Sequence, residues 1–364
     1  MSAANNSQKI EDSKVHESEK SNVTNFNKFD QHYFNSYSHY SIHQEMLQDS
    51  VRTKSYLDAI VNNKDYFKDK VVMDIGTGSG ILSMFISKYT DCKHIIAIDA
   101  SPVIYMAEKL YKKNNLDESR ISFVKMKVED IKELPNGIEK VDIIVSEWMG
   151  YFLIYESMLN SVLYARDRWM DKTGSLFPDK CSMHVAAMSD VDYYSDNVDF
   201  WDNVYGFDFS DFKPLVTVEP IVDYYNSSSV VSDTGNLIEF DLNTCTVEDL
   251  TFEREFEVNI TQDNSSFNGL LTWFDIVFPQ HDQKKKQVKF STGPFTQYTH
   301  WKQVGFYLEK EIECSYNDTF KGVLTCKPNK ENVRDMDIKI DYEFVPINQE
   351  KNQTVKASNS YTLH

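Results

Sequence analysis

The sequence predicts an α/β protein whose first half is a doubly wound parallel sheet and whose second half is rich in β-strands. In the first half, short apolar runs, several of them β-branched, alternate with helical stretches. That order is typical of strand–helix–strand units in a parallel sheet. From about residue 177 onward, short aromatic segments with alternating apolar residues follow one another, which indicates a β-sandwich or a β-barrel.

The individual elements follow from the same patterns. Strands are expected at Val71–Ile75, His94–Asp99, Ile121–Met126 and Val141–Glu147, and later at Glu253–Ile260, Leu270–Phe278 and Ile338–Val345. Helices are expected over Gln44–Val61, Gly80–Tyr89, Pro102–Asn114 and Glu156–Met170. Ser101 is the expected N-cap and Pro102 the first helical residue of the third of these. Residues 190–215 fit the strand alternation poorly and are interpreted as an insertion.

The domain organisation starts with a polar stretch, residues 1–28, that has few aromatics and no periodicity and is predicted to be a disordered tail. An aromatic, helical segment follows at 29–70, then a Rossmann-like domain at 71–176 and a β-rich domain at 177–364. A length of 364 residues agrees with two domains.

Charge is distributed unevenly along the chain. The formal net charge is −18, and residues 179–257 alone hold 18 acidic and 3 basic side chains. Such an excess argues against direct binding of nucleic acid, which calls for a basic surface. It favours a basic substrate, which the field of the protein attracts.

The cysteines and the N-terminus bear on the compartment. Five widely spaced cysteines without a CxxC fit neither a disulfide framework nor a zinc site. The sequence shows no apolar signal segment and no run of 18 apolar residues, so we expect neither secretion nor a membrane span. A cytoplasmic and nuclear location is expected. The Lys284–Lys286 run is either a nuclear signal or a solvated loop, and the solvated loop is favoured.

A glycine-rich loop follows the first strand. Asp74-Ile75-Gly76-Thr77-Gly78-Ser79-Gly80 has GxGxG spacing, and Ile81 stands where a dinucleotide fingerprint requires its third glycine. This spacing resembles the S-adenosylmethionine loop of class I methyltransferases, whose cationic ligand suits the carboxylate of Asp74. Asp99 ends the next strand and is placed to accept both ribose hydroxyls. A glycine-rich turn of any doubly wound domain remains the alternative.

Two glutamates lie at the end of the fourth strand. Glu147 is in Ser146-Glu147-Trp148-Met149-Gly150, and Glu156 follows nine residues later. Two carboxylates that face one another repel, whereas a guanidinium between them can donate hydrogen bonds to both. A solvated Glu147 and a helix-terminal Glu156 are the structural alternative.

Four motifs together resemble the protein arginine methyltransferases. Ser146–Leu159 is similar to the double-glutamate loop, Tyr33–Leu47 with Asp49–Thr53 to the N-terminal helix pair, Val71–Gly80 to the cofactor loop and Tyr298–Lys302 to the Thr-His-Trp loop. The closest match is to the predominant type I class, which makes mono- and asymmetric dimethylarginine. The resemblance implies a Rossmann-like methyltransferase domain, a β-barrel-like domain and a helical dimerisation arm near residues 190–220. Another class I methyltransferase or an inactive scaffold of the same fold are the alternatives.

The resemblance also assigns roles to residues. Glu147 and Glu156 would hold the acceptor guanidinium, and His300, oriented by Asp49, would act either as a base or as a strut. S-adenosylmethionine would be bound by residues of the N-terminal segment and of the strand ends. These are Tyr33, His43, Arg52, Asp74, Gly76, Gly78, Asp99 and Glu129, with Arg52 on the cofactor carboxylate and Glu129 on the adenine amino group.

Further residues are expected to contact the substrate. Tyr37, Met46, Met158 and Trp301 are assigned to the acceptor arginine, and the two methionines would leave room for a second methylation. The segment 29–70 would fold over the cofactor as a lid. Arginine-rich substrates such as Gly-Arg-rich RNA-binding proteins and histone tails, and a homodimer or higher homo-oligomer, are implied as partners. No metal is expected, because no ligand set accompanies His39 and His43.

Overall fold

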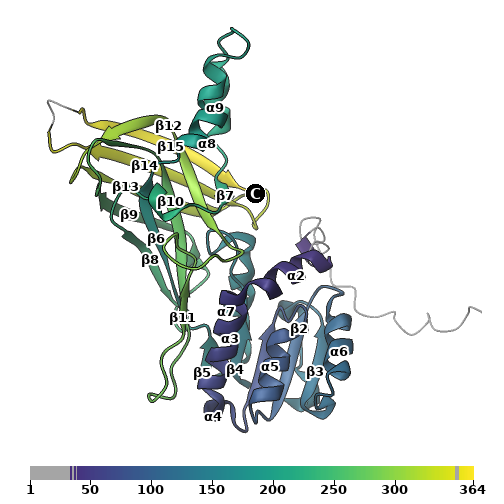
Figure 1. Ribbon diagram of the computed structural model, residues 1–364. Helices are drawn as coiled ribbons and strands as arrows, with labels where there is room; N and C mark the ends of the chain where they lie inside the picture. The colour runs from purple at the N-terminus through teal and green to yellow at the C-terminus, as the bar shows by residue number, and fades with distance from the viewer. Residues whose placement is uncertain (1–32, 35–36, 38, 349–351) are drawn as a thin grey trace, which may run out of the picture.

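The computed structural model describes residues 33–34, 37, 39–348 and 352–364. The predicted tail, 1–28, lies outside the described residues. The first domain is built on a parallel sheet of order β3-β2-β1-β4-β5 (Figure 1). Its strands are β1 (Val71–Ile75), β2 (His94–Asp99), β3 (Ile121–Lys125), β4 (Val141–Ser146) and β5 (Met170–Phe177). The central strand β1 is buried along its whole length, as its run of apolar residues predicts.

Helices cover the first sheet. The N-terminal helices are α2 (Tyr40–Gln48), α3 (Ser50–Asn62) and α4 (Lys64–Phe67), and the helices between the strands are α5 (Ile81–Tyr89), α6 (Ile104–Lys113) and α7 (Met158–Trp169). The single helix predicted over Gln44–Val61 is in fact two. The Asp49 side chain accepts a hydrogen bond from the backbone N of Arg52, 2.9 Å away, and so caps α3. The cap starts a new helix and breaks the predicted one.

Several other elements differ from the prediction, most of them by one or two residues at an end. Helix α6 begins at Ile104 instead of Pro102, because Ser101 donates its backbone N–H to Asp99 and its hydroxyl accepts from Val103 in a turn before the helix. Strand β5 was not predicted. Only its last three residues are buried, so its exposed first half carries no apolar signal.

The second domain consists of two antiparallel sheets. One has the order β7-β12-β10-β6-β8, with β11 paired to β10, and the other has the order β15-β14-β13-β9. Their strands are β6 (Lys180–Met188), β7 (Ile221–Asp223), β8 (Gly235–Asp241), β9 (Phe252–Asn259), β10 (Ser265–Val277), β11 (Lys289–Ser291), β12 (Gln303–Cys314), β13 (Thr319–Pro328), β14 (Met336–Val345) and β15 (Val355–Leu363). Phe267, Phe320 and Phe344 from the two sheets pack on one another with ring centroids 4.8 to 5.7 Å apart.

The predicted insertion is a projecting arm. It lies between β6 and β7 and contains α8 (Val191–Asn197) and α9 (Lys213–Val216), which extend away from both sheets (Figure 1). Tyr205 near its tip is 97% exposed, and Phe207 is also largely exposed. Apolar side chains that no part of the described chain covers indicate a surface for a partner.

The two domains are joined by a shared interface next to α3. Tyr56 of α3 packs edge-on against Phe278, and the Asn63 side chain donates to the backbone oxygen of Pro279 at 3.1 Å. The first sheet ends at Phe177 and the second domain begins at Lys180. The carboxyl ends of β1, β2 and β4 lie beneath α2, on the side of the first sheet that faces the second domain (Figure 1).

Two observations concern the described residues as a whole. All five cysteines are buried and free of disulfide bonds. Over the described ranges, none of the helices has the length and apolar character needed to cross a membrane.

Candidate active site

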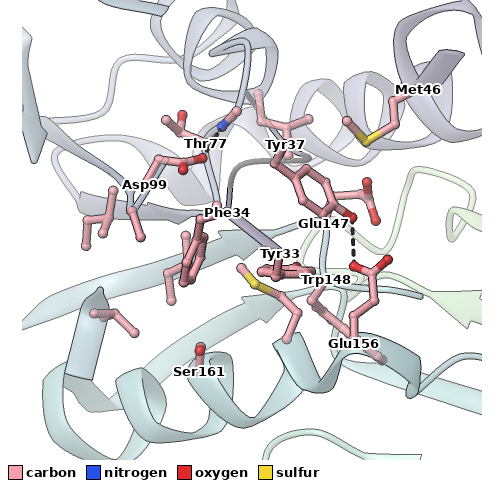
Figure 2. Close-up of a pocket in the computed structure, with 18 of the residues that line it drawn as sticks. Tyr33, Phe34, Tyr37, Met46, Thr77, Asp99, Glu147, Trp148, Glu156 and Ser161 are labelled. Atoms are coloured by element: carbon pink, nitrogen blue, oxygen red, sulfur yellow. Dashed lines mark hydrogen bonds between the residues drawn. The ribbon is translucent and has the colours of Figure 1, made fainter. Parts of the chain in front are cut away.

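A cavity of about 430 Å³ lies at the carboxyl ends of the first sheet (Figure 2). Of the sixteen predicted site residues, all except Asp49, Asp74 and Trp301 line it. Ligand sites of open α/β sheets occur at this edge, because the strand ends and the following loops leave a crevice there. The structure thus brings together side chains from the N-terminal segment, the first domain and the second domain.

The glycine loop forms one wall of the cavity. The backbone N–H groups of Gly76 and Thr77 both donate to the oxygen of Ile98, and Gly76 and Gly78 have φ of +70° and +52°. Residues other than glycine rarely adopt these backbone angles. A Cβ on Gly76 would also come within 2.6 Å of the Met158 side chain. Glycine is therefore required here for a backbone that approaches the ligand closely.

Asp74 lies behind this loop, not in the cavity. It is fully buried, and its Oδ2 accepts hydrogen bonds of 2.6 Å from the hydroxyls of Thr77 and Ser83. The assignment of Asp74 to the cofactor stays a prediction, and in the structure its carboxylate contacts hydroxyls of the loop and of α5. Asp74 holds the loop in shape.

Asp99 and Glu129 stand on the wall beside the loop. Asp99 accepts from the backbone N–H of Gly78 at 2.8 Å and of Ser101 at 2.7 Å (Figure 2). Burial raises the pKa of Asp99 to about 6, although these hydrogen bonds act to lower it. Glu129 accepts from the Ser161 hydroxyl at 2.6 Å. Both carboxylates line the cavity, where they can accept hydrogen bonds from a ligand.

Glu147 forms a buried ion pair with Arg52. The Nε and Nη2 atoms of Arg52 lie 2.7 and 2.6 Å from Glu147 Oε2, and both side chains are only 7% exposed. The resemblance implies that Arg52 contacts the cofactor and that Glu147 contacts the substrate. In the structure each is the other's partner, and both line the cavity.

Glu156 is held by a tyrosine from the N-terminal segment. The Tyr37 hydroxyl donates to Glu156 Oε2 at 2.7 Å (Figure 2). Burial raises the pKa of Glu156, and the hydroxyls of Tyr37 and Tyr33 oppose that rise. Glu156 has φ of +73° and lies in a short turn before α7, so the predicted helix start at Glu156 is wrong.

His300 and Asp49 form a second polar pair at the cavity. The Nδ1 atom of His300 is 2.7 Å from Asp49 Oδ2, which also accepts the backbone N–H of His300 at 2.9 Å. Burial acts to raise the pKa of Asp49, but hydrogen bonds from His300 and the backbone of Arg52 outweigh it, and the pKa is lowered. Asp49 is thus a carboxylate that orients His300, as the resemblance implied. His300 lines the cavity and Asp49 stands behind it.

Trp301 does not reach the cavity. It is 2% exposed, its indole N–H donates to the backbone oxygen of Met149 at 2.8 Å, and its ring stacks on Phe290. The contact of Trp301 with substrate stays a prediction, since the contacts of the side chain in the structure are with Met149 and Phe290. Its position in the structure joins the second domain to the double-glutamate loop.

The remaining predicted residues lie at the cavity as well. His43, through Nε2, is 2.8 Å from the backbone oxygen of Tyr37, and the sulfur of Met46 is 3.8 Å from Arg52 Nη2. Tyr33 and Met158 also line the cavity. Among the described residues, no group of three His, Cys, Asp or Glu side chains is arranged to hold a metal ion.

Sequence reasoning missed Arg334. It comes from the loop before β14, lines the cavity, and its guanidinium lies 3.9 Å from the centre of the Tyr33 ring. No motif marks this position, and only the folded chain brings it to the site. Phe34 and Ser161 also line the cavity without a predicted role, although Phe34 lies within the Tyr33–Leu47 motif.

The comparisons with known proteins agree with this geometry. Residues 179–347 match the arginine methyltransferase oligomerization subdomain, and residues 51–159 match the ribosomal protein L11 methyltransferase family. The chain is 48% identical over 342 residues to protein arginine N-methyltransferase 1 of Saccharomyces cerevisiae, covering 94% of this chain and 96% of that one.

Two solved structures are similar over most of the chain. One is the Trypanosoma brucei PRMT1 enzyme-prozyme heterotetrameric complex with AdoHcy, with a TM-score of 0.84, 41% identity, and coverage of 90% of this chain and 100% of that chain. The other is Arabidopsis thaliana protein arginine methyltransferase 10, with a TM-score of 0.78, 29% identity, and coverage of 91% and 99%.

The chain therefore belongs to the protein arginine N-methyltransferase family. It is an S-adenosylmethionine-dependent enzyme of the type I class. The residues present fit this cofactor: the GxGxG loop leaves its backbone bare, Met126 and Val128 supply apolar walls, and two carboxylates, Asp99 and Glu129, face the cavity. Carboxylates suit the hydroxyl and amino donors that a nucleoside presents.

Proposed function

We propose that this enzyme methylates arginines in basic protein segments, such as Gly-Arg-rich regions of RNA-binding proteins and histone tails, and forms mono- and asymmetric dimethylarginine. The observation that supports this most directly is the pair of glutamates, Glu147 and Glu156, in one cavity. Each already contacts a donor of this chain, Arg52 and Tyr37, so each is oriented before substrate arrives.

Two oriented carboxylates can bind a guanidinium by its planar fork of donors. An arginine does not lose its proton in water near neutral pH, so the site must make one nitrogen nucleophilic while the cation stays bound. Glu147 and Glu156 would draw the positive charge toward two of the nitrogens and leave the third to react. When bound, S-adenosylmethionine supplies the electrophilic methyl group on its sulfonium.

Other residues of the chain would position the cofactor and remove the proton from the methylated nitrogen. Arg52, Asp99 and Glu129 would hold the cofactor, and positioning of this kind supplies much of the acceleration in a reaction between two bound molecules. His300, which contacts Asp49 through Nδ1, would take up or relay the proton that the methylated nitrogen loses. The two methionines, Met46 and Met158, are flexible walls that accept a nitrogen already carrying a methyl group.

The acidic stretch 179–257 supports a basic substrate. It includes the arm and the first strands of the second domain, and it carries most of the net charge of −18. A field of this sign raises the local concentration of basic peptides. We place the enzyme in the cytoplasm and the nucleus, where such substrates occur.

We also propose a homodimer, or a higher homo-oligomer, formed by the arm. Its exposed aromatic side chains need a partner surface, and the arm belongs to the matched oligomerization subdomain. The first domain of a second copy, including its exposed Tyr105 and Met106 on α6, is the surface we assign to the arm.

A methylation assay tests the function. The protein is incubated with S-adenosylmethionine and a Gly-Arg-rich peptide, and the product is hydrolysed so that the methylarginines can be separated. We expect mono- and asymmetric dimethylarginine. Symmetric dimethylarginine would contradict the product assignment, and the absence of product from a protein that binds S-adenosylhomocysteine would favour the inactive scaffold.

A further inference from the structure

The loop before β14 reaches from the second domain into the active site. It is shaped by a turn in which the Asn332 side chain donates to Asp335 at 2.8 Å and the backbone N–H of Asp335 donates to the oxygen of Asn332. Arg334 lies within this turn and lines the cavity. It is a cationic side chain of the enzyme itself within a site that binds an arginine.

One side of Arg334 contacts the backbone of Glu156. Its Nη1 donates to the Glu156 oxygen at 2.6 Å, and the Glu156 N–H donates to the Arg334 oxygen at 3.0 Å. Next to them, the Ser157 hydroxyl donates to the oxygen of Val333 at 2.6 Å. Glu156 and Ser157 have φ of +73° and +59°, which residues other than glycine adopt only when surrounding contacts compensate the strain. The loop before β14 supplies these contacts.

The other side of Arg334 contacts the N-terminal aromatic segment. Its guanidinium is 3.9 Å from the centre of the Tyr33 ring and 5.4 Å from that of Phe34, both within cation–π distance. The Tyr33 ring is in turn 4.9 Å from the ring of Tyr37, whose hydroxyl donates to Glu156 (Figure 2). Arg334 therefore connects to Glu156 by two routes, one through the backbone and one through the aromatic segment.

We propose that Arg334 is a positioning residue for arginine methylation, which holds Glu156 in its left-handed conformation and holds Tyr33 and Tyr37 against it. The ordering of the segment that carries Tyr33 and Tyr37 is then coupled to the orientation of the Glu156 carboxylate. Arg334, a residue of the second domain, links the two. This inference rests on the enzymatic function and adds a residue that none of the four sequence motifs contains.

The guanidinium also acts on the charge of Glu156. The titratable groups that face Glu156 are Tyr33 and Tyr37 of the N-terminal segment, Glu147, Tyr151 and Tyr155 of its own loop, and Arg334. Burial and Glu147 raise the pKa of Glu156, whereas the two tyrosine hydroxyls and Arg334 lower it. Without the guanidinium the carboxylate is protonated at a higher pH, and Glu156 in that state can no longer balance a substrate cation.

The test compares Arg334→Ala and Arg334→Lys with wild type in the full-length enzyme. For Arg334→Ala we expect kcat on a Gly-Arg-rich peptide to fall by about tenfold or more, with a smaller change in the KM for S-adenosylmethionine. The acid limb of the pH profile of kcat should move to higher pH. Arg334→Lys keeps the positive charge but lacks the planar fork of donors. Compared with Arg334→Ala, its acid limb should lie closer to the wild-type position, and its kcat should be higher but still below wild type.

Hydrogen exchange gives a readout that does not depend on activity. In Arg334→Ala, peptides that cover residues 150–158 should exchange faster than in wild type, because the donor to the Glu156 oxygen is gone. Lys339→Ala is the matched control, since Lys339 is a half-exposed cation of the strand that follows, β14, and pairs with Asp341. It should change neither kcat nor the exchange of residues 150–158.

A double-mutant cycle with Tyr33→Leu tests the aromatic route. We expect the losses of kcat from Arg334→Ala and Tyr33→Leu to be less than additive, because both remove the same contact. If Arg334→Ala does not fold, Arg334→Lys with Tyr33→Leu takes its place. An active wild type together with unchanged kcat and pH profile in the Arg334 variants would overturn the positioning role. An inactive wild type would instead count against the proposed function.

Discussion

Arg52 and Glu147 form a buried ion pair in which Nε and Nη2 of the guanidinium both donate to one carboxylate oxygen, Oε2, and both side chains line the cavity. Arg52 lies on α3 and Glu147 follows β4, so the pair ties the N-terminal helices to the first sheet. Glu147 meets an enzyme guanidinium before it meets the substrate's.

Removing Arg52 should destabilise the protein. Arg52→Ala leaves Glu147 as an unpaired charge that is 7% exposed, and the free energy of unfolding should fall by about 3 kcal/mol. Denaturant unfolding monitored by circular dichroism measures this. Lys112→Ala, which breaks an exposed pair with Glu108, is the control and should leave the midpoint unchanged. Equal midpoints for the two variants would contradict a buried, structurally important pair.

Glu156→Gln should separate turnover from cofactor binding. Glu156 contacts Tyr37 and the loop before β14, not the glycine loop, so the affinity for S-adenosylhomocysteine should stay nearly unchanged. Turnover should fall by about 100-fold, because a neutral amide cannot balance the guanidinium charge. Calorimetry and a peptide assay give the two quantities, and Glu255→Gln on the exposed edge of β9 serves as control. A large loss of cofactor affinity would refute the assignment of Glu156 to the substrate.

Cofactor binding should weaken in acid because of Asp99. Burial raises the pKa of Asp99 to about 6, so the folded protein takes up this proton more readily than the unfolded chain. The resulting contribution to stability is complete below the unfolded pKa near 4 and is lost as the pH rises through about 6. Hydrogen bonds from ribose hydroxyls are much stronger to the ionised form, which accepts at both oxygens. Affinity for S-adenosylhomocysteine should therefore fall by about tenfold per pH unit below 6.

Titration calorimetry between pH 5 and pH 8 follows this change, with Asp99→Asn as the comparison. The variant has no carboxylate to protonate, so its weaker affinity should vary little over the same range. A wild-type affinity that is constant down to pH 5 would show that Asp99 stays ionised or does not contact the ligand.

The aromatic tip of the arm should control the oligomeric state. Tyr205→Ala combined with Phe207→Ala removes two exposed side chains without emptying the core, so the protein should fold but dissociate. Light scattering gives the molar mass. Tyr316→Ala alters an exposed tyrosine elsewhere in the second domain and should not change it. If the double variant keeps the wild-type mass, the arm tip is not the interface.

Substrate capture should depend on salt. Since residues 179–257 carry 18 acidic and 3 basic side chains, KM for a peptide with many basic residues should rise with ionic strength. A peptide with the same acceptor arginine and neutral flanks should respond less. If KM changes equally with salt for the two peptides, the acidic stretch does not capture substrate and contributes only to solubility.

Patterns local in the sequence predicted much of the fold. The strands Val71–Ile75 and His94–Asp99 begin and end as predicted, since each is a continuous apolar run that turn residues bound. Strand β5 was missed because Asp171 and Lys172 are exposed in its first half. The break between α2 and α3 depends on one capping side chain, Asp49, and helical periodicity continues across it.

In the candidate site, too, some features are local in the sequence and others are not. By itself the sequence determined the chemistry of this protein, because a GxGxG loop, two glutamates at a strand end and a histidine in a Thr-His-Trp motif can be recognised without the fold. Only the tertiary structure decided the partners, namely Glu147 with Arg52, Glu156 with Tyr37 and Arg334, and Trp301 with the loop at Met149. The physical reason is distance along the chain, because residues separated by about a hundred positions or more meet only when strand ends, helices and the second domain have packed.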